Sequence, residues 1–239
     1  MLCTKFRPAK PKKMRLNAYL ARAGVASRRG ADRLIKDGKV TVNGRPAELN
    51  DDISEGDVVE LNGKKVQVQN LRYILLYKPT GYITTLKDPH GRRKVADLIH
   101  IPERVVPVGR LDYDTTGALL LTNDGELANK LMHPSFEIDK VYEAEVQETI
   151  SEKILNMLSI GVELEDGKTA PARAVKLANN KIELTIHEGR NHQVKRMLDA
   201  VRMTVIKLHR SKFGPLNLNA LKTGEWRDLT PDEIAQLKG

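Results

Sequence analysis

The chain has 239 residues, a mass of 26.8 kDa, a formal net charge of +9 and a sequence pI near 9.5. This basic character favours polyanionic partners, whereas an aromatic content of 4% argues against a binding surface built mainly on stacking. One cysteine, Cys3, excludes a disulfide framework and a cysteine-ligated zinc site, and no apolar run approaches the roughly 18 residues that span a bilayer, so we expect a cytoplasmic protein without membrane contact.

Positive charge is concentrated at the N-terminal end of the chain. Residues 1–31 contain nine cations and no carboxylate. Residues 1–13, in which Pro8 and Pro11 stand among lysines, are predicted to form a disordered basic arm, and Met14 is a candidate physiological start. A merely soluble basic protein is the alternative, but charge gathered at one end favours a polyanionic partner.

Residues 14–68 are predicted to form a small module that opens with two helices. Apolar residues at helical spacing begin after Arg15, and Gly24 stands where a helix C-cap belongs. Ser27 is the expected N-cap of a second helix, which Gly38 ends. The connection between the helices is therefore only a few residues long.

Short strands are predicted to follow these helices over residues 40–42 and 57–61, and each strand runs into an Asn-Gly turn. Basic side chains crowd the helices: Arg22, Arg28, Arg29, Arg33 and Lys36. A solvated charged face is one interpretation of these residues. Because no acid accompanies the first three, we favour contact with phosphates.

This module resembles the S4 RNA-binding domain. The resemblance is carried by Arg15-Leu16-Asn17, by residues 23–29 between the helices and by residues 38–44 at the turn into the strands. It implies recognition of the shape and backbone of folded RNA. The residues that it implies as RNA contacts are Arg15, Arg22, Ser27, Arg28, Arg29, Lys36 and Lys39.

Residues 69–71 are predicted to be a linker, and residues 72–239 a second, larger domain. Strands are expected over 72–77, 140–146, 181–186, 205–208 and 226–229, and helices over 126–132, 151–158, 191–200 and from 230 onward. Strands dominate and their spacing is irregular. The pattern indicates an α+β fold in which helices flank a mixed, largely antiparallel sheet.

Asp112 and Asp114 stand on a charged turn between two apolar runs, 104–111 and 118–121. Charge placed between buried segments is costly unless it is paired or used, so this turn is the first candidate for chemistry. Structural turn residues that bind their own backbone are an equally good interpretation. The D-x-D-x-T spacing from Asp112 also suggests the nucleophile loop of haloacid-dehalogenase-type phosphatases, although no downstream acidic pair for a metal is evident.

Lys195 and Tyr142 each allow two interpretations. Lys195 lies off the apolar stripe of its helix, where it can pair with Asp199 at i+4 or reach Asp112 and keep that carboxylate ionised. Tyr142 is either a core tyrosine or a flat ring presented to a base. The two histidines of residues 187–192 are five apart and interrupted by glycine, so they do not form a zinc helix.

Four motifs stand in an order that resembles pseudouridine synthases of the RsuA/RluB branch. They are Gly109-Arg110-Leu111-Asp112-Tyr113-Asp114-Thr115-Thr116-Gly117, then residues 121–126, then Lys140-Val141-Tyr142, then residues 188–197 with the sequence EGRNHQVKRM. With the S4-like module in front, the resemblance covers residues 15 to about 235. It implies a catalytic aspartate at Asp112, an active-site tyrosine at Tyr142 and a basic partner of the aspartate at Lys195.

The resemblance further implies that Arg110 lies near an extruded base, that Arg190 contacts RNA and that Asp114 only holds the turn. It predicts isomerisation of a uridine in structured ribosomal RNA, with the large subunit slightly favoured, after the target base is flipped out of its stack. We expect a monomer that needs no metal or other cofactor and works on ribosomal RNA or a pre-ribosomal particle. A non-catalytic ribosome-assembly factor of the same fold is the alternative.

Overall fold

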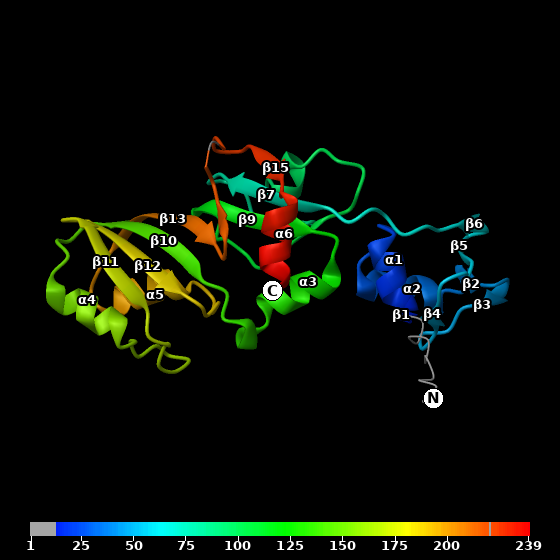
Figure 1. The fold of residues 1–239 in the computed structure, drawn as a ribbon, viewed down its shortest axis with the longest axis horizontal. Coiled ribbons are helices and arrows are strands. Elements are labelled where there is room, and N and C mark those ends of the chain that lie inside the picture. The colour runs from blue at the N-terminus through cyan, green and yellow to red at the C-terminus, as the bar shows by residue number, and fades with distance from the viewer. Residues whose placement is uncertain (1–12, 220) are drawn as a thin grey trace, which may run out of the picture. The chain divides into compact units, whose positions relative to one another are not determined.

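The computed structural model describes residues 13–219 and 221–239. The predicted basic arm, apart from Lys13, lies outside the described residues. The chain divides into two compact units, one ending at Asn70 and the other spanning Leu71–Gly239, which we call the N-terminal and C-terminal units (Figure 1). Both units combine helices and strands, which confirms the predicted α+β class. None of the described helices is long and apolar enough to cross a membrane.

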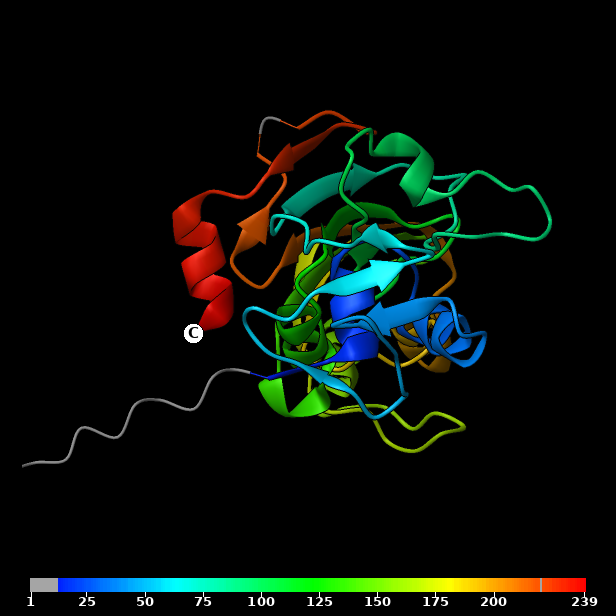
Figure 2. The ribbon, with the colours of Figure 1, turned by 90° about the vertical axis from the view of Figure 1, so that its right-hand side faces the viewer.

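The N-terminal unit consists of two helices and short strands, drawn in blue to cyan in Figure 2. Its elements are β1 Met14–Arg15, α1 Leu16–Arg22, α2 Arg28–Lys36, β2 Val40–Val42, β3 Arg45–Pro46, β4 Asp52–Ile53, β5 Val59–Leu61 and β6 Lys64–Lys65. Strand β1 pairs with β4, and the other four form a sheet in the order β3-β2-β5-β6. Buried residues of both helices and of β2 and β5 form one apolar cluster.

Local chemistry determines where these helices end, as the sequence predicts. Ser27 accepts a hydrogen bond from the Gly30 amide at 3.1 Å and thereby caps α2. Gly24 and Gly38 follow the two helices with φ of +79° and +67°, the left-handed region in which glycine has no steric penalty. Both predicted helices and both Asn-Gly turns are therefore confirmed.

The C-terminal unit is built on one sheet of nine strands within the described residues. The strands are β7 Tyr73–Lys78, β8 Val106–Pro107, β9 Thr116–Thr122, β10 Lys140–Val146, β11 Arg173–Ala178, β12 Lys181–Ile186, β13 Val205–Phe213, β14 Leu216–Asn217 and β15 Trp226–Asp228. Their order is β11-β12-β10-β13-β9-β7-β15, with β14 on β13 and β8 on β9. Only the β9–β13 pair is parallel, so the sheet is mixed and mostly antiparallel, as predicted.

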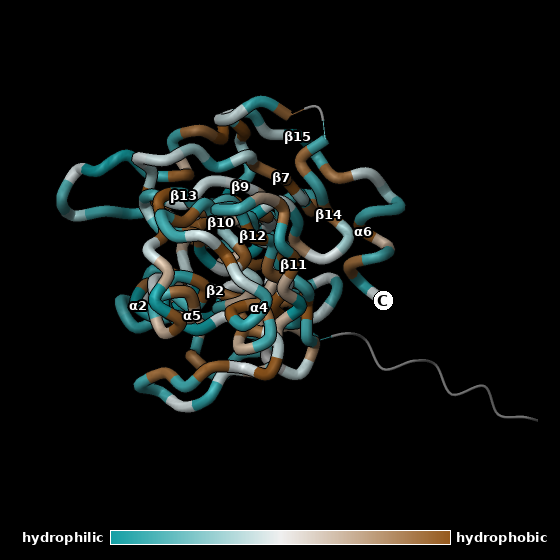
Figure 3. The backbone as a smooth tube through the Cα atoms, turned by 90° about the vertical axis from the view of Figure 1, so that its left-hand side faces the viewer, coloured by the Kyte–Doolittle hydropathy of each residue, from teal (hydrophilic) through white to brown (hydrophobic). Residues whose placement is uncertain are grey.

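Helices cover this sheet in two groups (Figure 1). They are α3 Gly125–Met132, α4 Glu152–Ser159, α5 Gln193–Ala200 and α6 Pro231–Lys238, with short 3-10 helices η1 Val95–Leu98 and η2 Pro134–Phe136. Helices α4 and α5 pack on β10, β12 and β13, and α3 and α6 pack on β7 and β9. Buried side chains of α4, α5, β10, β12 and β13 form one apolar cluster. Figure 3 shows hydrophobic stretches along β10, β12 and α4, which belong to this cluster.

Some boundaries differ from the predictions. Helix α5 begins at Gln193 rather than at residue 191, because His192 adopts a left-handed conformation with φ of +49°. Strand β13 extends five residues beyond the predicted end at Leu208. Strand β11 was not predicted, because most of its side chains are exposed and no apolar alternation marks it.

Candidate active site

The turn that carries Asp112 is fastened on both sides. Gly109, with φ of +75°, bends the chain after β8. Leu111 is buried, and its amide and carbonyl both bind the Thr84 hydroxyl, at 3.2 and 2.6 Å. The Thr115 amide donates to the carbonyl of Asp112 at 3.2 Å and closes the turn. These bonds hold the backbone of Asp112 at the N-terminal end of β9.

A buried lysine lies beneath this turn. Lys78, the last residue of β7, has no exposed surface, and its Nζ donates to the carbonyl oxygens of Asp112, Thr115 and Pro79 at 2.8, 2.9 and 3.0 Å. Burial lowers the pKa of Lys78 to about 8, although the nearby carboxylates of Asp112 and Asp114 favour its charged form. Nothing in the sequence pattern marks Lys78 as part of the site.

The Asp112 carboxylate faces two basic side chains from the start of α5. Its Oδ2 atom lies 3.7 Å from Lys195 Nζ, and its Oδ1 atom lies 3.4 Å from His192 Nε2. The structure therefore brings Asp112 and Lys195 together, as the sequence analysis expects. The sequence pattern raised His192 only as a metal ligand and argued against that role. The left-handed backbone that directs its ring toward Asp112 leaves no clear sequence signal.

The contacts of Asp114 differ from those that its expected role requires. We expected it only to hold the turn, but its Oδ1 atom accepts a hydrogen bond from Lys195 Nζ at 2.6 Å, closer than any atom of Asp112. This hydrogen bond is the main reason that the pKa of Asp114 lies below its usual value. Lys195 thus pairs with two carboxylates of the turn rather than with Asp199, the surface partner that the sequence allowed.

The cluster is accessible from outside the protein. An open groove of about 360 Å³ lies beside it, lined by Asp114, His192, Lys195 and Leu208 among others. The site therefore presents two carboxylates, beside the Lys195 ammonium, at a surface that a large substrate can reach.

Tyr142 lies on β10 and is supported by a buried arginine. The guanidinium of Arg210 lies 5.9 Å from the centre of the Tyr142 ring and 5.2 Å from that of Phe213, and one of its nitrogens lies 3.4 Å from the Tyr142 hydroxyl. Arg210 Nε also donates to the Ala118 carbonyl at 2.8 Å. Tyr142 is half-buried, and it packs against two apolar clusters, one beneath α4 and α5 and one that includes residues of β7 and β9.

Arg210 was not predicted, because the expected strand ended at Leu208, whereas β13 continues to Phe213. Leu208 and Arg210 occupy buried alternate positions of β13. An arginine at an inward position of a strand requires buried acceptors or a ring, and Tyr142 and Phe213 supply the rings.

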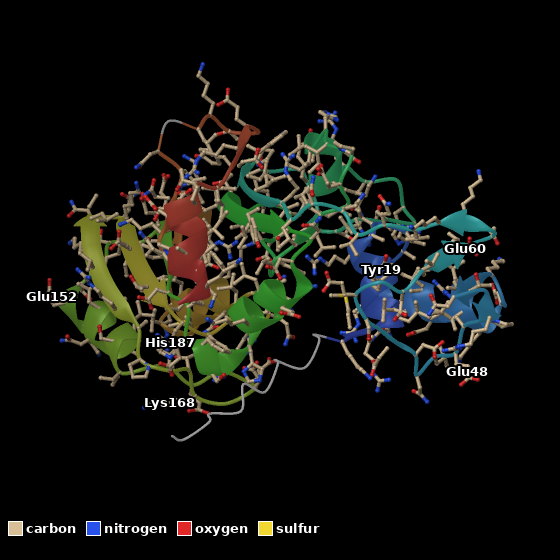
Figure 4. All side chains as sticks on the ribbon, turned by 45° about the vertical axis from the view of Figure 1, so that its right-hand side comes forward. Tyr19, Glu48, Glu60, Glu152, Lys168 and His187 are labelled. Carbon is tan, nitrogen blue, oxygen red and sulfur yellow. The ribbon has the colours of Figure 1, made fainter. Side chains whose placement is uncertain are left out.

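Two further basic residues near the site have internal partners. Lys140 Nζ donates to the carbonyls of Ile138 and His187 at 2.9 and 2.7 Å, and burial lowers its pKa to about 8. Arg190 donates to the carbonyls of Gly167 and Lys168, each at 2.7 Å, and so ties down the loop between α4 and β11 (Lys168 is labelled in Figure 4). Contact of Arg190 with RNA stays a prediction.

Arg110, by contrast, is exposed beside Asp112 and has no hydrogen-bond or ion-pair partner among the described residues. Among all the residues that the structure describes, no three His, Cys, Asp or Glu side chains are grouped as ligands for a metal ion.

The predicted RNA contacts of the N-terminal unit fall into two groups. Arg28, Arg29 and Lys36 are exposed on α2 and form no ion pair with other described residues. Three others have partners inside the unit: Arg15 binds Asp52 at 3.6 Å, Lys39 binds Asp37 at 3.4 Å, and Ser27 caps α2. Arg22 is half-buried, and its Nε atom is buried without a hydrogen bond to any described residue. The exposed group is therefore the better candidate for phosphate contacts.

Comparison with known proteins agrees with this architecture. Residues 72–200 match the family of RNA pseudouridylate synthases, and residues 14–59 match the S4 domain. Ribosomal large subunit pseudouridine synthase B of Bacillus subtilis (strain 168) is 52% identical over 232 residues, which are 94% of this chain and 95% of that protein. The dual-specificity RNA pseudouridine synthase RluF of Escherichia coli (strain K12) is 36% identical over 227 residues, 94% of this chain and 78% of that protein.

A solved crystal structure of a pseudouridylate synthase superimposes with a TM-score of 0.70 at 31% identity, covering 94% of this chain and 99% of that one. An S4 domain, the mixed sheet and the aspartate turn together define an RNA-modifying isomerase. The chain belongs to the RNA pseudouridylate synthase family, in the RsuA branch that carries an S4 domain. The D-x-D-x-T spacing at Asp112 is therefore not a phosphatase loop.

Proposed function

We propose that this enzyme converts one uridine, or a few, in structured large-subunit ribosomal RNA to pseudouridine, with Asp112 as its essential catalytic residue. The observation that carries the catalytic role is the convergence of Lys195, His192 and Lys78 on Asp112. The choice of RNA is supported by the 52% identical relative, which is named as a ribosomal large subunit pseudouridine synthase.

The reaction exchanges one bond for another within a single nucleotide. The glycosidic bond from N1 of uracil to C1′ breaks, the base turns, C5 bonds to C1′, and the proton lost from C5 is balanced by one gained at N1. Asp112 can start this reaction as a nucleophile at C1′ or as a base that removes a sugar proton. On both routes the Asp112 carboxylate must be ionised at the start, and the Lys195 ammonium lies 3.7 Å from it as a counter-charge.

The target uridine must leave its stack to reach Asp112, at a cost of a few kcal/mol. Tyr142 offers a ring, held by Arg210 from behind, on which the flipped base can stack. Arg110 can fill the space that the base leaves, because its side chain is exposed next to the catalytic aspartate. Arg28, Arg29 and Lys36 of the N-terminal unit would bind phosphates of the same folded RNA.

The proposal includes action as a monomer, in the cytoplasm, without metal or other cofactor. The reaction is an isomerisation and involves no net redox change and no group transfer to another molecule. The single cysteine, which suits a reducing compartment, supports the cytoplasmic assignment.

A pseudouridine map of ribosomal RNA from a strain that lacks this enzyme tests the proposal. We expect the loss of one or a few modifications in large-subunit RNA, and their return when the wild-type enzyme is supplied. A map with every modification in place would support the alternative, a ribosome-assembly factor without catalytic activity. A loss confined to small-subunit RNA would refute the proposed substrate but leave the reaction intact.

A further inference from the structure

The Lys195 ammonium lies between two carboxylates that are differently exposed. Its Nζ atom is 2.6 Å from Asp114 Oδ1 and 3.7 Å from Asp112 Oδ2. The Asp114 side chain is 67% exposed, whereas that of Asp112 is 29% exposed and that of Lys195 is 25% exposed. The lysine therefore makes its shorter contact with the carboxylate that is not the proposed reacting group.

The proposed reaction changes the charge of only one of these acids. On both routes Asp112 becomes neutral, either as an ester of C1′ or as a protonated acid. If Asp112 were the only acid beside Lys195, the ammonium would then lack a counter-charge in a largely buried position, which is unfavourable. Asp114 is not consumed on either route, and its carboxylate is already within hydrogen-bond distance of Nζ.

We propose that Asp114 is a positioning residue that holds Lys195 beside Asp112 while Asp112 is uncharged. The inference rests on the proposed function, because it needs a step in which Asp112 loses its charge. A lysine that stays in place favours the return of Asp112 to its ionised form, and so the release of the sugar.

The other charged groups around Lys195 do not replace Asp114. His192 and Lys78 face Asp112 and are basic, and Arg196 is engaged with Asp166. Asp199 lies one helical turn further along α5 and forms no ion pair with a described residue. Asp114 is thus the one acid besides Asp112 that contacts the ammonium among the described residues.

A double-mutant cycle tests this inference. Asp114→Asn should lower the single-turnover rate of pseudouridine formation about tenfold or more and change the affinity for RNA less than about twofold, because the contact acts on Lys195. In a Lys195→Gln background, Asp114→Asn should have no further effect. Asp114→Glu should restore part of the rate. Asp199→Asn, which removes a carboxylate one helical turn from Lys195 on α5, should leave the rate unchanged.

Three kinetic outcomes would overturn the inference: a wild-type rate in Asp114→Asn, an equal loss with and without Lys195, or a loss that Asp199→Asn reproduces. The pairing is also measurable without turnover, as the 15N signal of the Lys195 ammonium group. Asp114→Asn should shift this signal and Asp199→Asn should not, and an unmoved signal would overturn the inference. If the wild-type enzyme itself forms no pseudouridine in this assay, the proposed function is refuted, and this result is distinct from a failure of the inference about Asp114.

Discussion

Lys78 Nζ donates a 2.8 Å hydrogen bond to the backbone carbonyl of Asp112, so the proposed catalytic residue is held from below by a fully buried ammonium. The same nitrogen binds Thr115 and Pro79 and joins the end of β7 to the turn. The buried charge is compensated by three carbonyl dipoles and by the nearby acids. Side-chain chemistry at Asp112 therefore depends on a backbone that is fixed by a residue outside the motif.

Replacing Lys78 by Met should disable the enzyme and destabilise it. The substitution removes one donor from each of three carbonyls, of which Asp112 keeps the Thr115 amide, and a buried carbonyl left without any donor costs about 1–3 kcal/mol. We expect a loss of at least about 100-fold in the single-turnover rate, together with a lower midpoint in urea unfolding. Exposed Lys168→Met is the matched control and should change neither. A Lys78→Met enzyme with normal activity would show that the turn is held without this contact.

The buried lysine of β10 gives a prediction about pH. The pKa of Lys140 is about 8 in the folded protein, because of burial and the nearby Arg210, and about 10.4 in an unfolded chain. Between these values the unfolded chain holds a proton that the folded protein has released, so Lys140 makes the free energy of unfolding rise with pH. Below pH 8 its burial penalty is present in full.

Urea unfolding of the wild type and of Lys140→Met checks this direction. The free energy of unfolding of the wild type, minus that of the variant, should increase from pH 7.5 to pH 10. The same difference for Lys168→Met should stay flat. A difference for Lys140→Met that falls with pH would contradict the assigned burial of the ammonium.

Local chemistry made much of the fold predictable. Gly24, Ser27 and Gly38 act within one helical turn, so the sequence alone indicates where α1 and α2 end. Partners far apart in sequence were not predictable in this way. Lys78 reads as the end of a strand before Pro79, yet its acceptors Asp112 and Thr115 lie 34 and 37 residues away. The resemblance to a family supplied Lys195 as a partner of Asp112, but neither it nor the spacing revealed the shorter contact with Asp114.

Gly117 sets how closely β9 can approach β13. It has φ of +126°, and a Cβ atom placed there would lie 2.2 Å from the carbonyl oxygen of Arg210. Gly117→Ala should therefore lower the free energy of unfolding by about 3 kcal/mol or more, since it adds a backbone clash to a conformation that L-residues avoid.

Gly109→Ala is the matched control for Gly117→Ala. Gly109 also has a positive φ, of +75°, but no atom lies within 4 Å of an added Cβ. Its substitution should cost only the conformational strain, about 1–2 kcal/mol. Equal losses in urea unfolding would show that the approach of the two strands does not constrain residue 117.

The exposed arginines at the start of α2 should determine part of the salt dependence of RNA binding. Removing one phosphate-binding cation reduces the slope of log K against log salt by about 0.7–0.9. Arg28→Gln combined with Arg29→Gln should thus reduce the slope by about 1.5 and weaken binding at low salt. The guanidinium of Arg45 is paired with Asp51 at 2.7 Å, so Arg45→Gln should reduce the salt slope less. An unchanged slope in the double variant would place the phosphate contacts elsewhere on the N-terminal unit.

The central claim is that Asp112 performs the chemistry, and one comparison tests it most directly. Purified wild-type enzyme and Asp112→Asn are each incubated with a large-subunit ribosomal RNA transcript, without added metal or cofactor, and pseudouridine is quantified. The Asn variant should unfold at the wild-type urea concentration and bind the transcript with similar affinity. We predict pseudouridine with the wild type and none with Asp112→Asn; comparable yields from both would contradict the catalytic role of Asp112.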